Sequence, residues 1–270
     1  MPRAGSTLLQ NILAQNPAFY VTPTSGVLDL IYGARINYTN GPEFKAQDPK
    51  LMEKAFLAFC RSGMEGYYRS ITDRPCVWDK SRGWGVHFDL LTVIFGSEPK
   101  VVCMVRDLRQ IAASLEKRYR KNPVQHKPTE NHAAMEGITT YRRVVQRFQT
   151  VSLGLALERL YEVHTRGFAF KMLFIRYEDL VRNPASAMKQ IYSYVQMPEF
   201  THNFDHIEQV TQEDDSVFES SGLHVIRPKL APLPEDYLQI LGSPAVKYIE
   251  SNFGWYFERF GYAFSQPRQV

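Results

Sequence analysis

Short β-rich runs alternate with helical stretches along this chain, and that alternation limits the folds it can adopt. The strongest strand signal is Lys100–Val105 (KVVCMV), and Leu108–Tyr119 follows it with helical spacing of apolar residues. A buried strand is also predicted at Pro75–Asp79, before a helix at about 84–95, and a third strand is predicted at Met172–Ile175. Strands that alternate with helices are typical of a parallel sheet covered by helices. The sequence therefore predicts an α/β domain.

The remaining elements fit the same domain. No Pro-, Gly- or Ser-rich linker divides the chain, so residues 1–270 are predicted to form a single domain. Two boundaries have clear signals: Asn16-Pro17 closes the first helix, and Asp48-Pro49 opens another as N-cap and first-turn proline. Further helices are predicted at Ser6–Gln15, from Thr139 to about His164, from Pro184 to about Val195 and from Pro244 toward Phe257, with a surface loop or lid at Arg120–Gly137.

Composition excludes several classes of protein. Hydrophobic residues make up 44% of the 270 residues and charged residues 22%, which fits neither a disordered nor a fibrous chain. No apolar run approaches the roughly 18 residues of a membrane-spanning helix, and no apolar signal-peptide region follows Met1. The net charge of +4 comes without a dense basic run, which favours a small polyanionic ligand over a nucleic acid.

The three cysteines indicate a reducing compartment. Cys60, Cys76 and Cys103 cannot pair completely, and none belongs to a Cys-x-x-Cys pair of the kind that binds zinc. We therefore expect a cytoplasmic protein.

The most informative segment is the first, Pro2–Leu9 (PRAGSTLL), in which a turn of small residues runs directly into a helix. Backbone N–H groups and the positive end of the helix then converge on one point, and the hydroxyls of Ser6 and Thr7 add donors. Arg3 brings a fixed positive charge to the same place. These features predict an anion site, with an ordinary helix N-terminus capped by Ser6 as the alternative. The segment holds no lysine, so it is not a Walker A loop.

A second basic segment begins where the strongest predicted strand ends. Arg106 lies at the carboxyl end of that strand, where open α/β sheets bind their ligands. Ser114 follows eight residues later, about two helical turns on, and Arg118 lies one turn further on the same face. The three are spaced to bind one phosphate together. The alternative is a solvated ion pair of Arg106 with Asp107 or Glu116.

Taken together, these two segments resemble the sulfotransferases that use 3′-phosphoadenosine 5′-phosphosulfate (PAPS) as donor. The resemblance rests on PRAGSTLL, on Val-Arg-Asp and on a serine eight residues after that arginine. Arg176–Leu180 (RYEDL) resembles a third block of the family, and Val225–Lys229 (VIRPK) its late basic block. The blocks look most like those of the tyrosylprotein branch and its prokaryotic and viral relatives. The resemblance implies a P-loop-like, three-layer α/β fold with a central parallel sheet flanked by helices.

The resemblance also implies a donor site with two cationic parts, one for each separated anionic group of PAPS. Arginine's planar fork suits both groups. Core packing is the alternative role for Tyr177, and a solvated loop is the alternative for Arg227 and Lys229. The implied donor-binding residues are Arg3, Ala4, Gly5, Ser6, Thr7 and Leu8 for the phosphosulfate, Arg106, Ser114 and Arg118 for the 3′-phosphate, Tyr177 for adenosine, and Arg227 with Lys229 for closure over the phosphates.

Lys80 resembles the lysine that the family places near the transferred group. It follows a predicted strand in Val77–Ser81 (VWDKS), where a surface lysine is the alternative. The implied reaction is in-line sulfuryl transfer to an acceptor hydroxyl or amine, which leaves adenosine 3′,5′-bisphosphate as product. Such a reaction depends on positioning and on charge stabilisation, for which we expect Arg3 and Lys80 to serve as the catalytic groups. No metal is expected to take part.

This sequence departs from the family pattern in two places. A strand normally precedes the phosphosulfate loop, whereas this sequence begins at the loop, so we expect the first strand of the sheet to be lacking or replaced from elsewhere. The tyrosylprotein branch carries a glutamate about twenty residues after the loop arginine, where this chain has Thr24, which is not a base at neutral pH. Asp29 and His87 are the nearest candidate bases, and a structural role is the alternative for each. The base and the acceptor remain unassigned.

Two other functions stay open at this point. The missing strand and base fit a nucleotide-binding homologue that has lost catalysis. The loop-to-helix architecture alone also fits a kinase-like phosphoryl transferase, for which Asp79 and Asp107 are the candidate magnesium ligands. His126 and His132 are too far apart in a loop to suggest a metal pair.

Overall fold

The structure is a computed structural model that describes residues 1–121, 139–150, 153–218, 224–232, 234 and 236–265. Its described strands form two parallel pairs. In one pair β1 (Phe19–Thr24) lies beside β2 (Cys76–Lys80), and in the other β3 (Val102–Val105) lies beside β4 (Leu173–Arg176). Among the described residues no backbone ladder joins the two pairs. The predicted α/β fold, with parallel strands flanked by helices, is confirmed.

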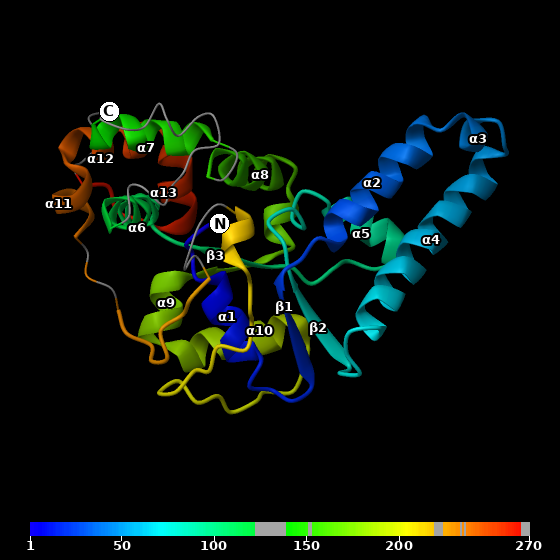
Figure 1. Cartoon of the computed structure of the whole chain (residues 1–270), viewed down its shortest axis with the longest axis horizontal. Helices are drawn as coiled ribbons and strands as arrows, with labels where there is room; N and C mark the ends of the chain where they lie inside the picture. Colours follow the sequence, from blue (N-terminus) through cyan, green and yellow to red (C-terminus); the bar gives the residue numbers. More distant parts are fainter. Residues whose placement is uncertain (122–138, 151–152, 219–223, 233, 235, 266–270) are drawn as a thin grey trace.

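Helices surround both pairs of strands (Figure 1). Helix α1 lies against β1, while α2, α3 and α4 project to one side as a helical arm. No helix in the described part of the chain is both long enough and apolar enough to cross a lipid bilayer. The helices are α1 (Ser6–Leu13), α2 (Val27–Asn40), α3 (Pro42–Lys45), α4 (Pro49–Arg69), α5 (Phe88–Phe95), α6 (Leu108–Lys121), α7 (Thr140–Gln149), α8 (Gly154–Thr165), α9 (Tyr177–Arg182), α10 (Pro184–Val195), α11 (Tyr237–Leu241), α12 (Ser243–Asn252) and α13 (Gly254–Phe260).

Local sequence signals account for several helix boundaries. At the start of α4, the Asp48 carboxylate accepts a hydrogen bond from the backbone N–H of Leu51 at 2.8 Å, and Pro49 occupies the first turn. At α10, Asn183 caps the backbone N–H of Ser186 ahead of Pro184 in the same way. These caps confirm the predicted helix starts at residues 49 and 184.

Two predictions of helix length were wrong. The helix predicted from Thr139 to about His164 is divided into α7, which ends at Gln149, and α8, which begins at Gly154. At Gly154 a Cβ atom would lie 2.5 Å from the carbonyl oxygen of Phe148, so only glycine permits this close approach. The last helical region likewise divides into α12 and α13 at Phe253. Hydrophobic periodicity continues across such turns, since both halves face one core.

The sequence also failed to predict β1, for a physical reason. This strand contains Pro23, and its register with β2 shifts between Val21 and Thr24. Proline cannot donate to a ladder and is tolerated in strands at edges and bulges, so the segment carries a weak strand signal. The predicted loop at Arg120–Gly137, with His126 and His132, lies almost wholly outside the described residues.

Two hydrophobic cores fix the elements that surround the site. One core packs α6, α7, α8, α12 and α13 together, with Leu108, Ile111 and Ile249 fully buried in it. The other packs α1, β1, β4 and α10 together, and Ile12 and Phe19 are fully buried there. Helix α1 therefore packs in one hydrophobic core and α6 in the other.

Candidate active site

Residues 1–5, which precede α1, form the first loop of the chain. A cleft of about 1340 Å³ opens where this first loop, the end of β2 and the start of α6 meet. Arginines and lysines line it on every side, whereas Asp79 is its single carboxylate among the described residues. That carboxylate accepts hydrogen bonds from the Tyr68 hydroxyl and the Trp84 indole N–H, both at 2.6 Å. The cleft therefore has the electrostatic character of a polyanion site.

The first loop turns sharply before it enters α1. Arg3 and Gly5 both adopt positive φ angles, of 57° and 86°. A Cβ atom at residue 5 would lie 2.6 Å from the ring of Tyr177, so this position requires glycine both for its backbone angle and for space. Gly5 is the N-cap of α1, and no side chain caps the helix. Ser6 is thus not the N-cap, and the alternative of an ordinary serine-capped helix is wrong.

Arg3 connects the two basic segments of the sequence. Its Nε donates a hydrogen bond to Ser114 Oγ at 3.4 Å, although the two residues lie 111 positions apart. The Arg106 Nη1 group donates to the Arg3 carbonyl oxygen at 3.1 Å, and the Arg106 guanidinium lies 4.6 Å from the centre of the Tyr177 ring. Arg118 also lines the cleft. The structure therefore gathers the predicted phosphosulfate loop, the predicted phosphate-binding residues and Tyr177 in one place.

The carboxylates that were alternative partners for Arg106 are occupied by other arginines. Asp107 pairs with Arg109 at 2.5 Å, and Glu116 pairs with Arg143 at 2.6 Å. Among the described residues neither forms an ion pair with Arg106. The Nε of Arg106 is buried and has no hydrogen-bond partner in the described structure. A buried guanidinium with an unsatisfied donor fits an anionic ligand.

The positions and the charges of Arg3, Arg106 and Arg118 both favour the binding of an anion. The hydroxyl of the fully buried Tyr256 bonds to the backbone N–H and C=O of Arg106 at 3.1 and 2.8 Å, which fixes the start of α6. Burial lowers the pKa of Arg3, and the nearby charges of Arg118 and Arg106 lower it further. Since these cations repel each other, a bound anion relieves an unfavourable arrangement.

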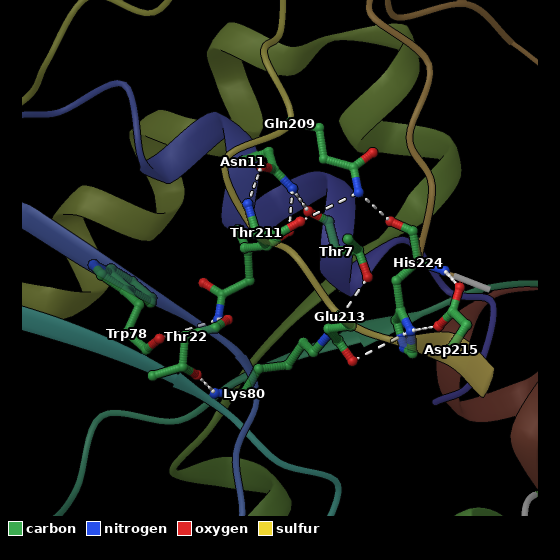
Figure 2. Close-up of polar contacts among 11 residues, drawn as sticks. Thr7, Asn11, Thr22, Trp78, Lys80, Gln209, Thr211, Glu213, Asp215 and His224 are labelled. Carbon is green, nitrogen blue, oxygen red and sulfur yellow. Dashed lines mark hydrogen bonds and ion pairs between the residues drawn. The ribbon is translucent and has the colours of Figure 1, made fainter. Parts of the chain in front are cut away.

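Lys80 is the last residue of β2 and points toward the first loop (Figure 2). Its backbone N–H donates to Thr22 Oγ1 at 2.9 Å, and its Nζ lies 3.4 Å from Thr7 Oγ1 and 2.5 Å from Glu213 Oε1. Its side chain is 12% exposed. Lys80 is therefore a largely enclosed, ion-paired lysine at the cleft, and the surface-lysine alternative is wrong.

A late segment supplies acidic and imidazole groups that the sequence analysis missed. Glu213 Oε2 lies 3.2 Å from His224 Nδ1, and the same ring nitrogen lies 2.5 Å from Asp215 Oδ1. His224 lines the cleft (Figure 2). Burial acts to raise the pKa of Glu213, but the hydrogen bonds of Lys80 and Thr24 and the charge of Lys80 outweigh it and lower that pKa. No periodic or motif signal marks these residues in the sequence.

Asn11 of α1 anchors this late segment. Its side-chain oxygen accepts hydrogen bonds from the backbone N–H groups of Val210 and Thr211 at 2.6 and 3.1 Å, and its amide donates to Thr211 Oγ1 at 2.8 Å. The helix that begins in the first loop therefore also positions Glu213, two residues further along.

The other predicted residues are placed as follows. Leu8, Arg227 and Lys229 line the cleft, but Lys229 Nζ pairs with Asp205 at 3.1 Å on the exposed surface. Ala4 is fully buried beneath the loop. Neither candidate base is among the residues that line the cleft: Asp29 is exposed, and burial with the charges of Arg35 and Arg159 lowers the pKa of His87. Six further arginines and lysines of the lining were not predicted from the sequence: Arg82, Lys100, Lys117, Lys121, Arg147 and Arg159.

The chain was compared with known families, curated proteins and solved structures. The model of a family described as the sulfotransferase family matches residues 1–202. Two solved structures are similar: the sulfotransferase domain from the Synechococcus PCC 7002 olefin synthase, with 18% identity over 89% of this chain and 90% of that one and a TM-score of 0.41, and the sulfotransferase domain from the curacin biosynthetic pathway, with 16% identity over 94% of each chain and a TM-score of 0.45. No curated protein matches the chain.

Proposed function

This chain belongs to the sulfotransferase family, and from that premise we propose that it transfers a sulfuryl group from PAPS to an acceptor hydroxyl or amine by in-line displacement. One observation supports the proposal above all others. Arg3 of the first loop is hydrogen-bonded to Ser114 and accepts a hydrogen bond from Arg106 through its carbonyl oxygen. Two basic sequence segments about a hundred residues apart therefore form one cationic site.

The donor carries two separated anionic groups, and the cleft offers a cationic group for each. In this proposal the loop N–H groups, Arg3 and the hydroxyls of Ser6 and Thr7 bind the phosphosulfate. Arg106, Ser114 and Arg118 bind the 3′-phosphate, and the Tyr177 ring lines the adenosine site. The unsatisfied Nε of Arg106 suits such a ligand, and Gly5 lets the Tyr177 ring pack directly against the loop.

The reaction needs charge stabilisation at the bond that breaks. The sulfur–oxygen bond to the 5′-phosphate breaks while a new sulfur–oxygen or sulfur–nitrogen bond forms to the acceptor, so negative charge builds on the departing oxygen. Lys80 and Arg3 are the groups in this proposal that stabilise that charge, since both lie beside the start of α1. Lys80 is tied to Glu213 in this structure and would exchange that contact for the donor.

Ligand binding tests the donor site. Thermal unfolding of the chain is measured with adenosine 3′,5′-bisphosphate and, separately, with ATP and magnesium. A ligand at 100 times its dissociation constant stabilises the folded chain by about 2.7 kcal/mol. We expect a clear shift with the bisphosphate, loss of that shift in Arg3→Ala, and an unchanged shift in Arg61→Ala, whose exposed side chain pairs with Glu65. A shift with ATP and magnesium but none with the bisphosphate would contradict the proposal.

Turnover separates an active enzyme from a homologue that only binds nucleotide. Labelled sulfate from PAPS is followed into a panel of phenols, alcohols and amines, and release of the bisphosphate is followed in parallel. We expect turnover that is lost in Lys80→Ala. Binding of the bisphosphate without any turnover would instead support the nucleotide-binding alternative.

A further inference from the structure

We propose that His224 accepts the proton of the incoming acceptor during sulfuryl transfer, and that Asp215 and Glu213 position it for that role. This inference rests on the proposed function and assigns the base that the sequence leaves unidentified. It depends on three observations: the contacts of one ring nitrogen, the place of the ring in the cleft, and the link to Lys80.

Two carboxylates contact the same nitrogen of His224. Asp215 Oδ1 lies 2.5 Å from Nδ1, Asp215 Oδ2 accepts a hydrogen bond from the His224 backbone N–H at 3.3 Å, and Glu213 Oε2 lies 3.2 Å from Nδ1. An ionised carboxylate only accepts hydrogen bonds, so the proton of a neutral imidazole resides on Nδ1. Nε2 then carries the lone pair that can accept a proton.

The ring lies at the cleft, and the carboxylates that hold it lie behind it. His224 lines the cleft, while the side chains of Glu213 and Asp215 are 4% and 9% exposed. Figure 2 shows the His224 ring between these two acids, with Lys80 on the far side of Glu213. An acceptor molecule in the cleft therefore meets the imidazole before it meets either carboxylate.

Glu213 joins the proposed base to the lysine of the reaction. Its Oε1 lies 2.5 Å from Lys80 Nζ, which in turn lies 3.4 Å from Thr7 Oγ1 in the first loop. The proton acceptor and the cation that stabilises the leaving oxygen thus stand on opposite sides of one carboxylate. Both residues line the same cleft as the first loop.

Glu213 itself is the less suitable base. It is ion-paired with Lys80, is almost fully buried and has a lowered pKa, which makes its carboxylate a weak proton acceptor. Histidine is the side chain that enzymes use most often as a general acid or base. When His224 accepts a proton, the two neighbouring carboxylates stabilise the imidazolium that forms.

The step balances as follows. The acceptor oxygen or nitrogen forms a bond to sulfur while the bond from sulfur to the bridging oxygen breaks. The bridging oxygen keeps the electron pair of that bond and leaves with adenosine 3′,5′-bisphosphate. The proton of the acceptor moves to Nε2 of His224 and is later released to solvent.

Water serves as the acceptor in the test, so no natural acceptor has to be known. The probe is PAPS, and the readout is release of adenosine 3′,5′-bisphosphate under saturating donor. We expect His224→Ala to lower the release rate at least about 100-fold, which is the lower range for loss of a general base. Affinity for the bisphosphate should remain within about twofold, and imidazole added to the buffer should restore part of the rate.

Three further variants distinguish loss of the proton acceptor from a general disturbance of the fold. His206→Ala removes an exposed histidine of the same irregular segment and should leave the release rate unchanged. His224→Gln keeps a side-chain donor for Asp215 but has no basic nitrogen, so it should be as slow as the alanine variant even if the alanine variant folds poorly. Asp215→Asn should lower kcat and leave the KM for PAPS unchanged, because it affects the proton acceptor through its orientation.

The outcomes distinguish this inference from the proposed function. Release at the wild-type rate by a folded His224→Ala protein would overturn the role of His224 and leave the sulfotransferase assignment intact. Loss of release in Glu213→Gln with normal release in His224→Ala would make Glu213 the base. Tight binding of the bisphosphate by a wild-type chain that releases none from PAPS, either with water alone or with the acceptor panel, would overturn both proposals.

Discussion

Two carboxylates of this molecule, Glu116 and Glu213, are both buried and ion-paired, but they lie in different parts of the fold. Glu116 on α6 is fully buried and holds Arg143 at 2.6 Å and Arg120 at 3.0 Å. Glu213 is 4% exposed and holds Lys80 at 2.5 Å. For both, burial favours a raised pKa, but the hydrogen bonds from their cations prevail and lower it.

The difference lies in the elements that carry the partners. Glu116 and its arginines stand on α6 and α7, two helices packed on one core, and both carboxylate oxygens are hydrogen-bonded. Glu213 belongs to an irregular segment, its Oε2 makes no hydrogen bond in the described part of the chain but lies 3.2 Å from His224 Nδ1, and its cation lines the cleft. An ion pair fixed between two packed helices therefore stabilises the fold, whereas an ion pair between an irregular segment and a cleft residue can be exchanged for a bound ligand.

Removal of the charge from Glu116 should produce the largest effect. Glu116→Gln leaves Arg143 buried without its counter-charge, which costs about 3–5 kcal/mol of the free energy of unfolding. Chemical denaturation measures this loss. The control is Glu65→Gln on the exposed face of α4, which should change the free energy of unfolding by less than about 1 kcal/mol. An equally small change in Glu116→Gln would contradict a stabilising role for the Glu116 ion pair.

Removal of the cation at the cleft should act on turnover instead. We expect Lys80→Ala to lower kcat by about 10²–10³, or about 2.7–4 kcal/mol of transition-state stabilisation. Affinity for adenosine 3′,5′-bisphosphate should change little, because the loop N–H groups and the arginines remain. Steady-state kinetics with PAPS and calorimetric binding measure the two effects. A large loss of affinity with an unchanged kcat would place Lys80 in ground-state binding.

Glu213→Gln should cost less stability than Glu116→Gln. Lys80 borders the cleft, so its ammonium can be solvated once its partner is neutral, and we expect a loss of about 1 kcal/mol in the free energy of unfolding. Urea denaturation of both variants side by side measures the difference. Equal losses would show that the two acids contribute to stability in the same way.

The smallest expected effect of the two acids is on the pH dependence of stability. The pKa of each acid is lower in the folded chain than in the unfolded one, so each contributes stability that is fully present above the unfolded pKa of about 4.3. That stability is lost as pH falls through the folded-state pKa. Stability measured between pH 7 and pH 3 should therefore fall less steeply in Glu116→Gln and in Glu213→Gln than in the wild type. A wild-type slope in either variant would show that its carboxylate is not stabilised by folding.

The sequence predicted one half of the site far better than the other, because the two halves are encoded differently. Arg3, Arg106 and Ser114 belong to short segments in which a strand end or a helix start places the residue, so local pattern suffices. Glu213 and His224 lie in an irregular stretch without periodicity, and the Lys80–Glu213 contact spans 133 positions. Only the packed fold brings such residues together.

The fold shows the same division. The helix starts at Asp48 and Asn183 were predictable, since a capping side chain and a proline define each of them. The strand β1 and the turn at Gly154 were not. β1 depends on pairing with β2 to offset Pro23, and the turn depends on how two helices meet the core.

The hydrogen bond between Asn11 and Thr211 has a consequence for the order in which parts of the chain can form during synthesis. Its two residues stand 200 positions apart, so during synthesis α1 leaves the ribosome long before the segment that it anchors. Closing so long a loop is slow compared with forming a helix. The first loop and α1 can therefore form early, whereas the ion pair between Lys80 and Glu213 can form only after most of the chain has been synthesised. The first loop of a nascent chain is thus made well before the late segment that completes the surroundings of Lys80.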